Sequence, residues 1–127
     1  MSTLTPTQTK ALQDSLLQRE QQLLQEIQSA RAEKEQHAQD AEDFAPEPDA
    51  NQSRANSDLE VRHAELLRDQ QELQDVRAAL KRVAEGEYGE CMDCGKGIAL
   101  ARLQAFPTAK RCIDCQTQHE AQKRRLA

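Results

Sequence analysis

The chain has 127 residues, a net charge of −5 at pH 7, 37% hydrophobic residues and only 2% aromatic residues. This composition excludes a large globular core, because too little bulky apolar material is available to fill one. It suits long solvated helices and a small compact part that a bound metal stabilises in place of a core. The acidic balance also argues against a general affinity for nucleic acid, whose phosphates recruit lysine and arginine.

The first predicted helix begins at a capping box. Thr5 is followed three residues later by Gln8, and Pro6 suits the first helical position. Because no glycine or further proline follows for more than thirty residues, we expect one helix over residues 6–43. Its apolar residues follow a heptad repeat and become smaller and more polar beyond Ala30. The repeat consists of Leu16, Leu23 and Ile27, which Leu12, Leu17 and Leu24 broaden into a stripe.

Two prolines end this helix. Pro46 and Pro48 stop α-helix and bias the residues before them towards extended backbone. We therefore expect a turn over about residues 44–52, which is too short to act as a linker between domains.

A second long helix follows the turn. It begins at Ser53 or at Ser57, which opens another capping box, and it ends at Glu85, where Gly86 is placed as a C-cap. Its apolar residues recur every seven positions, with a valine three residues after each of the last two leucines. They are Leu59, Leu66, Leu73, Leu80, Val76 and Val83.

Two helices of similar length joined by a short turn predict an antiparallel coiled-coil hairpin. The alternative is a parallel leucine zipper that dimerises and binds DNA through a basic region before Leu59. Residues 40–60 are acidic instead, so we expect a hairpin within a monomer.

All four cysteines of the chain lie in two CxxC pairs that seventeen residues separate. They are Cys91, Cys94, Cys112 and Cys115. This spacing is typical of a structural zinc site, because zinc prefers four thiolates in a tetrahedron. Gly95 can close the turn of the first pair with a positive φ, whereas the second pair runs into helix-compatible sequence and can open a helix. We expect one structural Zn²⁺ bound by these four residues.

Three other interpretations of the cysteines are weaker. Disulfides suit small secreted proteins, and the sequence shows no signal-peptide pattern. A redox CxxC requires a βαβ setting, but the preceding sequence is helical. A catalytic zinc keeps one open position, and four thiolates leave none.

The expected fold class is mainly α. It comprises a long antiparallel coiled-coil hairpin, a small four-cysteine zinc-finger module and a short helix from Gln116 to the C-terminus. We divide it into an N-terminal segment with the hairpin, residues 1–85, and the finger with the C-terminal helix, residues 86–127. A small apolar set forms the expected core of the finger. Its members are Tyr88, Ile98, Leu100, Leu103, Phe106 and Ile113.

The residues around the cysteines resemble the zinc-finger signature of the DksA/TraR family. The similarity extends over about residues 80–116. It rests on Leu80, Arg82, Val83, Gly86, Tyr88, Gly89, Cys91, Cys94, Gly95, Ile98, Arg102, Leu103, Ala105, Pro107, Ala109, Cys112 and Cys115. The helical hairpin and the last helix also resemble the longer, DksA-like members.

The resemblance implies a transcription regulator that binds bacterial RNA polymerase. Family members insert the coiled-coil tip into the secondary channel, where acidic tip residues modulate initiation, and they do not bind promoter sequences themselves. The family motif Asp-x-x-Asp-x-Ala occurs here at Asp40 and Asp43, before the middle of the hairpin. Counting from Cys91 places the tip nearer Pro48 to Asn51, where Glu47, Asp49 and Asn51 occur without the motif. Either Asp40 and Asp43 or Glu47 and Asp49 could carry the acidic function, and the positions of the prolines favour the second pair.

The resemblance also bears on the nucleotide ppGpp. Responsive members use basic residues beside the finger, and two of those positions correspond to Phe106 and Gln116. Neither can pair with phosphate, so we expect weak or absent ppGpp binding.

The main alternative function is a zinc-ribbon module that binds nucleic acid or another protein. It would use Lys110, Arg111 and the basic run at residues 123–125. An enzyme is not expected, because the sequence has neither a nucleophile motif nor a glycine-rich phosphate loop. No apolar run is long enough to span a membrane, and we expect a cytoplasmic protein.

Overall fold

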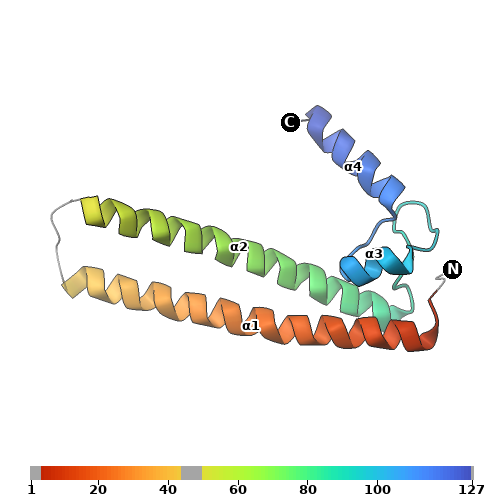
Figure 1. Ribbon diagram of the computed structural model, residues 1–127, viewed down its shortest axis with the longest axis horizontal. Helices are drawn as coiled ribbons and strands as arrows, with labels where there is room; N and C mark the ends of the chain where they lie inside the picture. The colour runs from red at the N-terminus through yellow and green to blue at the C-terminus, as the bar shows by residue number, and fades with distance from the viewer. Residues whose placement is uncertain (1–3, 44–49, 127) are drawn as a thin grey trace. The chain divides into compact units, whose positions relative to one another are not determined.

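The computed structural model describes residues 4–43 and 50–126, without the side chains of residues 34, 37–43 and 50–56. These ranges contain four helices and no strand, apart from an isolated antiparallel bridge between Glu90 and Gly97. The helices are α1 (Pro6–Asp43), α2 (Ala50–Glu85), α3 (Leu100–Ala105) and α4 (Ile113–Leu126) (Figure 1). The predicted fold class is confirmed. None of the described helices combines the length and the apolar character that a membrane span requires.

The contacts divide the chain into two compact units. One comprises Met1–Glu20 and Asp75–Ala127, and the other comprises Gln21–Gln74. Within each unit, the parts of α1 and α2 lie side by side and antiparallel (Figure 1). The first unit also contains the finger, α3 and α4. The sequence-based division between residues 85 and 86 stays a prediction.

Helix α1 begins as its capping box predicts. The Thr5 N–H donates to Gln8 Oε1 at 3.0 Å, and the Gln8 N–H donates to Thr5 Oγ1 at 3.1 Å. This reciprocal pair satisfies a backbone donor that the first helical turn would otherwise leave open.

Helix α2 begins at Ala50, earlier than either predicted start at Ser53 or Ser57. The reason is that no proline or glycine follows Pro48 until the end of the helix. Alanine, glutamine and arginine, which occur in this opening stretch, are good helix formers. A capping box marks a possible start, but it does not prevent a helix from extending further towards the N-terminus. The turn predicted over about residues 44–52 is therefore wrong at residues 50–52, which are helical, and its remaining residues, 44–49, lie outside the described residues.

Gly86 ends α2 as the sequence predicts. Its φ is +76°, a left-handed conformation that glycine adopts readily. The Gly86 N–H donates to Val83 O at 3.2 Å, and the Glu87 N–H donates to Arg82 O at 2.9 Å. These two bonds form a Schellman motif and satisfy carbonyls of the last turn.

The seam between α1 and α2 is narrower than the leucine stripe suggested. Leu16 is 1% exposed and Leu23 is fully buried, but their neighbours Leu17 and Leu24 are 44% and 36% exposed. A single partner helix covers only the a and d positions, so residues that flank them stay in contact with water. The buried seam residues are Leu12, Leu16, Val76 and Ala79 in the first unit, and Leu23, Ile27 and Leu66 in the second.

We predict that Leu16→Ala costs about 2–5 kcal/mol of the free energy of unfolding, because it leaves a cavity in a fully packed seam. The neighbouring Leu17→Ala should cost less than about 1 kcal/mol, because that side chain is already half exposed. Urea unfolding of the zinc-loaded chain, followed by far-UV circular dichroism, measures both. Equal losses for the two variants would contradict the assigned register.

Candidate functional site

The first cysteine pair lies in a tight turn that its backbone closes. The Cys91 N–H donates to Lys96 O at 2.8 Å, and the Gly95 N–H donates to Cys91 O at 2.9 Å. Gly95 has a φ of +76°, and a Cβ built there would meet nothing within 4 Å. The glycine is therefore required by backbone conformation and not by lack of space.

The second cysteine pair lies at the start of α4. Cys112 immediately precedes the helix and Cys115 lies in its first turn, where the Gln116 N–H donates to Cys112 O at 2.9 Å. A backbone bond from Met92 N–H to Lys110 O, 2.9 Å long, connects this segment to the first pair. The expectation that the second pair opens a helix is confirmed, although the helix begins at Ile113 and not at Gln116.

The structure brings the four thiols together. All four Sγ atoms lie within 4.8 Å of one another. A tetrahedron with Zn–S bonds near ~2.3 Å has S···S edges of about 3.8 Å, and Cys94 Sγ and Cys112 Sγ are 3.8 Å apart. That distance is far longer than a disulfide bond of about 2.05 Å. The donor set and its spacing therefore fit a tetrahedral zinc ion.

The acidities of the thiols also fit a metal site. Burial would raise the pKa of Cys91, but backbone N–H groups of Cys94, Cys112 and Asp93 outweigh it and lower the pKa to about 6. Hydrogen bonds to Cys112 and Cys91 raise the pKa of Cys115 well above its ordinary value. Four thiolates this close would repel one another, so the thiols cannot all lose their protons unaided. A divalent cation that replaces the protons compensates this repulsion.

The core of the finger is smaller than predicted. Tyr88 is 3% exposed, and Ile98 and Leu103 are fully buried. Phe106 and Ile113, which we expected in this core, are 61% and 60% exposed. The reason is that Ile113 opens α4, none of whose described residues is buried, and Phe106 lies beyond the end of α3.

Helix α3 had no clear signal in the sequence. It has six residues, and Ala99 at its N-cap makes no side-chain capping bond. Its position depends on tertiary contacts, above all on the buried Leu103. The Tyr88 hydroxyl donates to Pro107 O at 2.8 Å just after the helix, which attaches this segment to the core of the finger.

A notch of about 410 Å³ lies in the first unit beside α4. Both positions that the sequence associated with ppGpp, Phe106 and Gln116, line this notch, together with Asp75. The guanidinium of Arg102 lies 5.8 Å from the centre of the Phe106 ring. The structure therefore places an aromatic ring and an amide on the walls of a notch that is also lined by the cations Arg82, Arg102 and Lys110.

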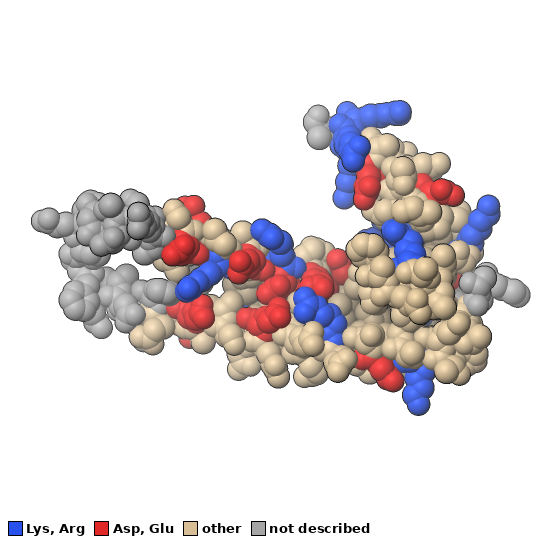
Figure 2. Space-filling view, viewed as in Figure 1, with Lys and Arg blue, Asp and Glu red and all other residues tan. Residues whose placement is uncertain are grey.

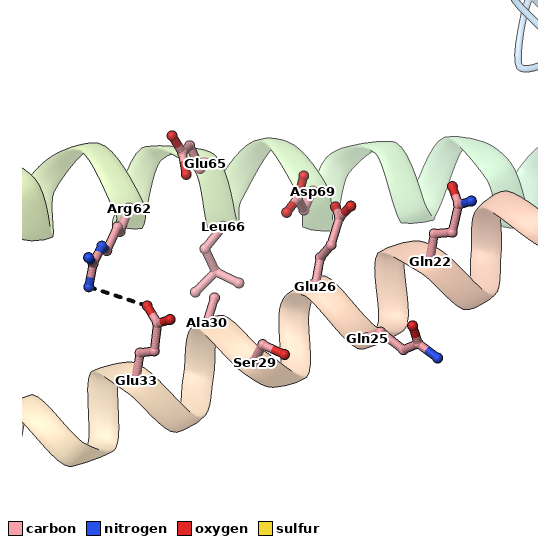
Figure 3. Close-up of a pocket in the computed structure, with 10 residues that line it drawn as sticks. All are labelled: Gln22, Gln25, Glu26, Ser29, Ala30, Glu33, Arg62, Glu65, Leu66 and Asp69. Atoms are coloured by element: carbon pink, nitrogen blue, oxygen red, sulfur yellow. Dashed lines mark hydrogen bonds and ion pairs between the residues drawn. The ribbon is translucent and has the colours of Figure 1, made fainter.

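The second unit carries an acidic groove of about 760 Å³. Figure 3 shows Ala30 and Leu66 pointing towards each other from α1 and α2. The short side chain of Ala30 leaves space at this point, as expected where the predicted seam becomes smaller. Arg62 donates to Glu33 Oε2 at 3.3 Å across the groove. The other carboxylates that line the groove belong to Glu26, Glu65 and Asp69.

The candidate tip residues belong to the end of α1 and to the segment that follows it in the sequence. Asp40 and Asp43 belong to the last part of α1, but their side chains lie outside the described part. Glu47 and Asp49 lie outside the described residues altogether. Both pairs therefore stay predictions.

The end of α4 is basic. Lys123, Arg124 and Arg125 form its last turn, and all three are exposed. Figure 2 shows lysine and arginine side chains gathered at this end of the helix. Cations here are favourable beside the partial negative charge of a helix C-terminus.

Residues 86–121 match the family model of the prokaryotic dksA/traR C4-type zinc finger. With the four clustered thiols, this match confirms the prediction of one structural zinc ion.

The similarity of this chain to known proteins extends beyond the finger. The chain is 31% identical to the "RNA polymerase-binding transcription factor DksA" of Caulobacter vibrioides, over 92% of this chain and 79% of that protein. It is 34% identical to the protein of the same name from Escherichia coli, over 72% of this chain. The alignment spans only 60% of that relative's length. The structure matches that of transcription factor DksA2 from Pseudomonas aeruginosa with a TM-score of 0.74 and 29% identity, over 94% of this chain and 88% of that chain.

We predict that the purified chain holds one zinc per molecule and that Cys115→Ser loses most of it. Serine is close to cysteine in size, but it lacks the soft thiolate that zinc prefers. Titration with a colorimetric zinc chelator measures the stoichiometry. Thr117→Ser, at an exposed position on the same helix, is the control and should keep the metal, because serine retains a hydroxyl that can donate to Ile113 O.

We also predict that stability falls at alkaline pH because of Tyr88. Burial raises its pKa to about 12, although the nearby Arg82 opposes this. The unfolded chain releases the proton near pH ~10, so the contribution is complete below that pH and is lost as the pH rises towards ~12. The loss should be on the order of 2–3 kcal/mol.

Tyrosinate absorbance tests this prediction directly, because the chain has one tyrosine and no tryptophan. Tyr88→Phe should remove the corresponding part of the pH dependence measured by urea unfolding. An unshifted titration near pH ~10 would contradict the buried environment.

Proposed function

We propose that this chain, which belongs to the DksA/TraR family, is a transcription regulator that binds bacterial RNA polymerase. The observation that carries the proposal is the match to relatives of that name over most of the chain, together with the agreement in fold with a solved DksA2 structure. The chain spans about three-fifths of the length of several of these relatives. For this reason RNA polymerase, which the names of these relatives give as their partner, is a proposed partner of this chain.

The coiled-coil hairpin would be the part that enters the polymerase. We propose that its tip inserts into the secondary channel and modulates initiation through carboxylates. A helical pair suits this task, because its backbone hydrogen bonds are internal and its thickness is only two helices. The acidic residues at the tip would be Asp40 and Asp43, or Glu47 and Asp49.

The zinc ion would have a structural role. We propose Cys91, Cys94, Cys112 and Cys115 as its four ligands. When bound, the ion supplies a cross-link that the finger's small core cannot replace. Four thiolates leave no open position for a substrate, so we propose that the protein is not an enzyme.

We propose that ppGpp binds this chain weakly or not at all. Phe106 and Gln116 line the notch where responsive relatives present basic residues, and Asp75 adds a negative charge there. At these two positions a guanosine tetraphosphate would meet side chains that cannot pair with phosphate. Three cations, Arg82, Arg102 and Lys110, also line the notch, and two carboxylates, Asp75 and Glu120, oppose their charge. Isothermal titration of the zinc-loaded chain with ppGpp should give no binding at micromolar concentration.

We further propose a monomer in the cytoplasm that does not read DNA sequence. A hairpin already covers the apolar seam of each helix with its partner, which leaves that seam unavailable for dimerisation. RNA polymerase, the proposed partner, acts in the cytoplasm of bacteria.

The alternative is a zinc-ribbon module that binds nucleic acid, and the exposed basic end of α4 favours it. Such binding would weaken steeply with salt, because lysine and arginine release counterions from phosphates. The two functions therefore differ in an easily measured quantity. Binding to DNA or RNA at physiological salt, without binding to polymerase, would favour the alternative.

We predict that one pair of tip carboxylates carries the regulatory effect. In-vitro transcription with purified RNA polymerase compares the wild type with Asp40→Ala/Asp43→Ala and with Glu47→Ala/Asp49→Ala. Substitution of the pair that acts should reduce the effect on initiation about tenfold or more, equivalent to ~1.4 kcal/mol. Co-purification with core polymerase should persist in both variants, because the rest of the hairpin is unchanged.

Glu35→Ala serves as the control, because Glu35 is an exposed carboxylate of α1 outside both pairs. It should leave the effect on initiation within about twofold. If polymerase binding persists and substitution of neither tip pair changes the effect on initiation, the role proposed for the tip is wrong. Absence of binding at micromolar concentration would overturn the proposed function itself.

A further inference from the structure

An ion pair connects the two cysteine pairs directly. Arg111 Nε donates to Asp93 Oδ2 at 2.8 Å. Asp93 lies between Cys91 and Cys94, and Arg111 immediately precedes Cys112. The bridge therefore joins the turn of the first pair to the residue that introduces the second pair, beside the four thiols.

The arginine of this bridge is shielded from water. The Arg111 side chain is 12% exposed, whereas Asp93 is 43% exposed. A short, charge-assisted hydrogen bond with a shielded donor is screened less by solvent than an ion pair on the open surface. The pair thus differs from the exposed Arg62–Glu33 pair of the second unit, whose two side chains are 52% and 58% exposed.

Arg111 is also fixed through its backbone. Arg102 Nε donates to Arg111 O at 3.1 Å, which attaches the residue to α3. The Met92 N–H donates to the carbonyl of Lys110 at 2.9 Å, one residue before Arg111. The segment that precedes Cys112 is therefore fixed by a side-chain bridge and by two bonds to its carbonyls.

We infer that Arg111 is a positioning residue of the metal centre, whose bridge to Asp93 holds the two cysteine pairs in register and slows the release of zinc. A competitor can take the metal only after the pairs move apart, and the bridge opposes that movement. This inference goes beyond the proposed function, because it concerns retention of the metal and not the polymerase.

A simpler explanation is that Arg111 acts only through its charge. Four thiolates around one zinc ion carry a net negative charge, so any nearby cation would favour the bound state. Asp93 separates the two explanations. If charge alone mattered, Asp93→Asn would remove a repulsive negative charge and slow the release of zinc. If the bridge matters, the same substitution removes its charge, leaves at most a weaker neutral hydrogen bond and accelerates release.

The experiment follows zinc release from the full-length, zinc-loaded chain into an excess of a colorimetric chelator, without polymerase. We expect Arg111→Gln and Asp93→Asn each to accelerate release about tenfold, within the range of about 10–100-fold typical of residues that orient metal ligands. The double variant should be no faster than the faster single variant, because both substitutions remove the same ion pair. Arg111→Lys should restore part of the slow release.

Two matched controls come from the chain itself. Asp114 occupies the same place in the second CxxC pair as Asp93 does in the first, and no ion pair of Asp114 occurs among the described side chains. Lys110 is an exposed cation next to Arg111. Asp114→Asn and Lys110→Gln should change the release rate by less than about twofold.

A spectroscopic readout distinguishes positioning from a general loss of stability. Each variant is loaded with Co²⁺, whose visible absorption reports the arrangement of the four sulfurs. Loss of the bridge should broaden or shift these bands in the Arg111 and Asp93 variants but not in the Asp114 and Lys110 controls. Circular dichroism of the same samples shows whether the helices are retained.

Three results would overturn the inference. One is slower zinc release from Asp93→Asn, which would show that charge alone acts. Another is additive acceleration in the double variant, which would show that the two residues act independently. The third is an effect of Lys110→Gln as large as that of Arg111→Gln. None of these results would bear on polymerase binding, so the proposed function would be judged separately.

Discussion

The close approach of four thiols is the constraint on which the zinc finger of this protein depends. Two cysteine pairs separated by seventeen residues must bring all their Sγ atoms within 4.8 Å. Only a few apolar side chains support this arrangement, among them Tyr88, Ile98 and Leu103. Such a core is too small to hold a fold by hydrophobic burial alone. The finger is therefore built from directed bonds, namely metal ligation, tight turns and the bridge between Asp93 and Arg111.

The helical pair follows a different physical rule. Its helices cover each other along a narrow seam, and the remaining surface is polar, so the energy of burial is spread over many turns. Where a seam residue is small, as at Ala30, the two helices leave a groove instead of a packed layer. One chain thus combines a part in which a few contacts matter greatly with a part in which many contacts each contribute modestly.

Much of this architecture could be predicted because its signals are local. The capping box at Thr5, the C-cap at Gly86 and the positive φ of Gly95 depend on neighbouring residues only, and all three are confirmed. The error at the start of α2 has the same origin. Ser53 and Ser57 offer local start signals, but helix propensity continued the helix to Ala50.

The sequence by itself determined the two long helices, the four cysteines as candidate zinc ligands and the family, because residue type and spacing specify each of them. Only the tertiary structure decided which side chains are covered. In the structure Phe106 and Ile113 are exposed, whereas Ala79 is buried. Helix α3 forms without a capping signal, and Arg111 pairs with Asp93. The physical reason is that burial and ion pairing depend on which segments meet in space. The pattern of one segment cannot reveal what another segment, seventeen or more residues away, brings to it.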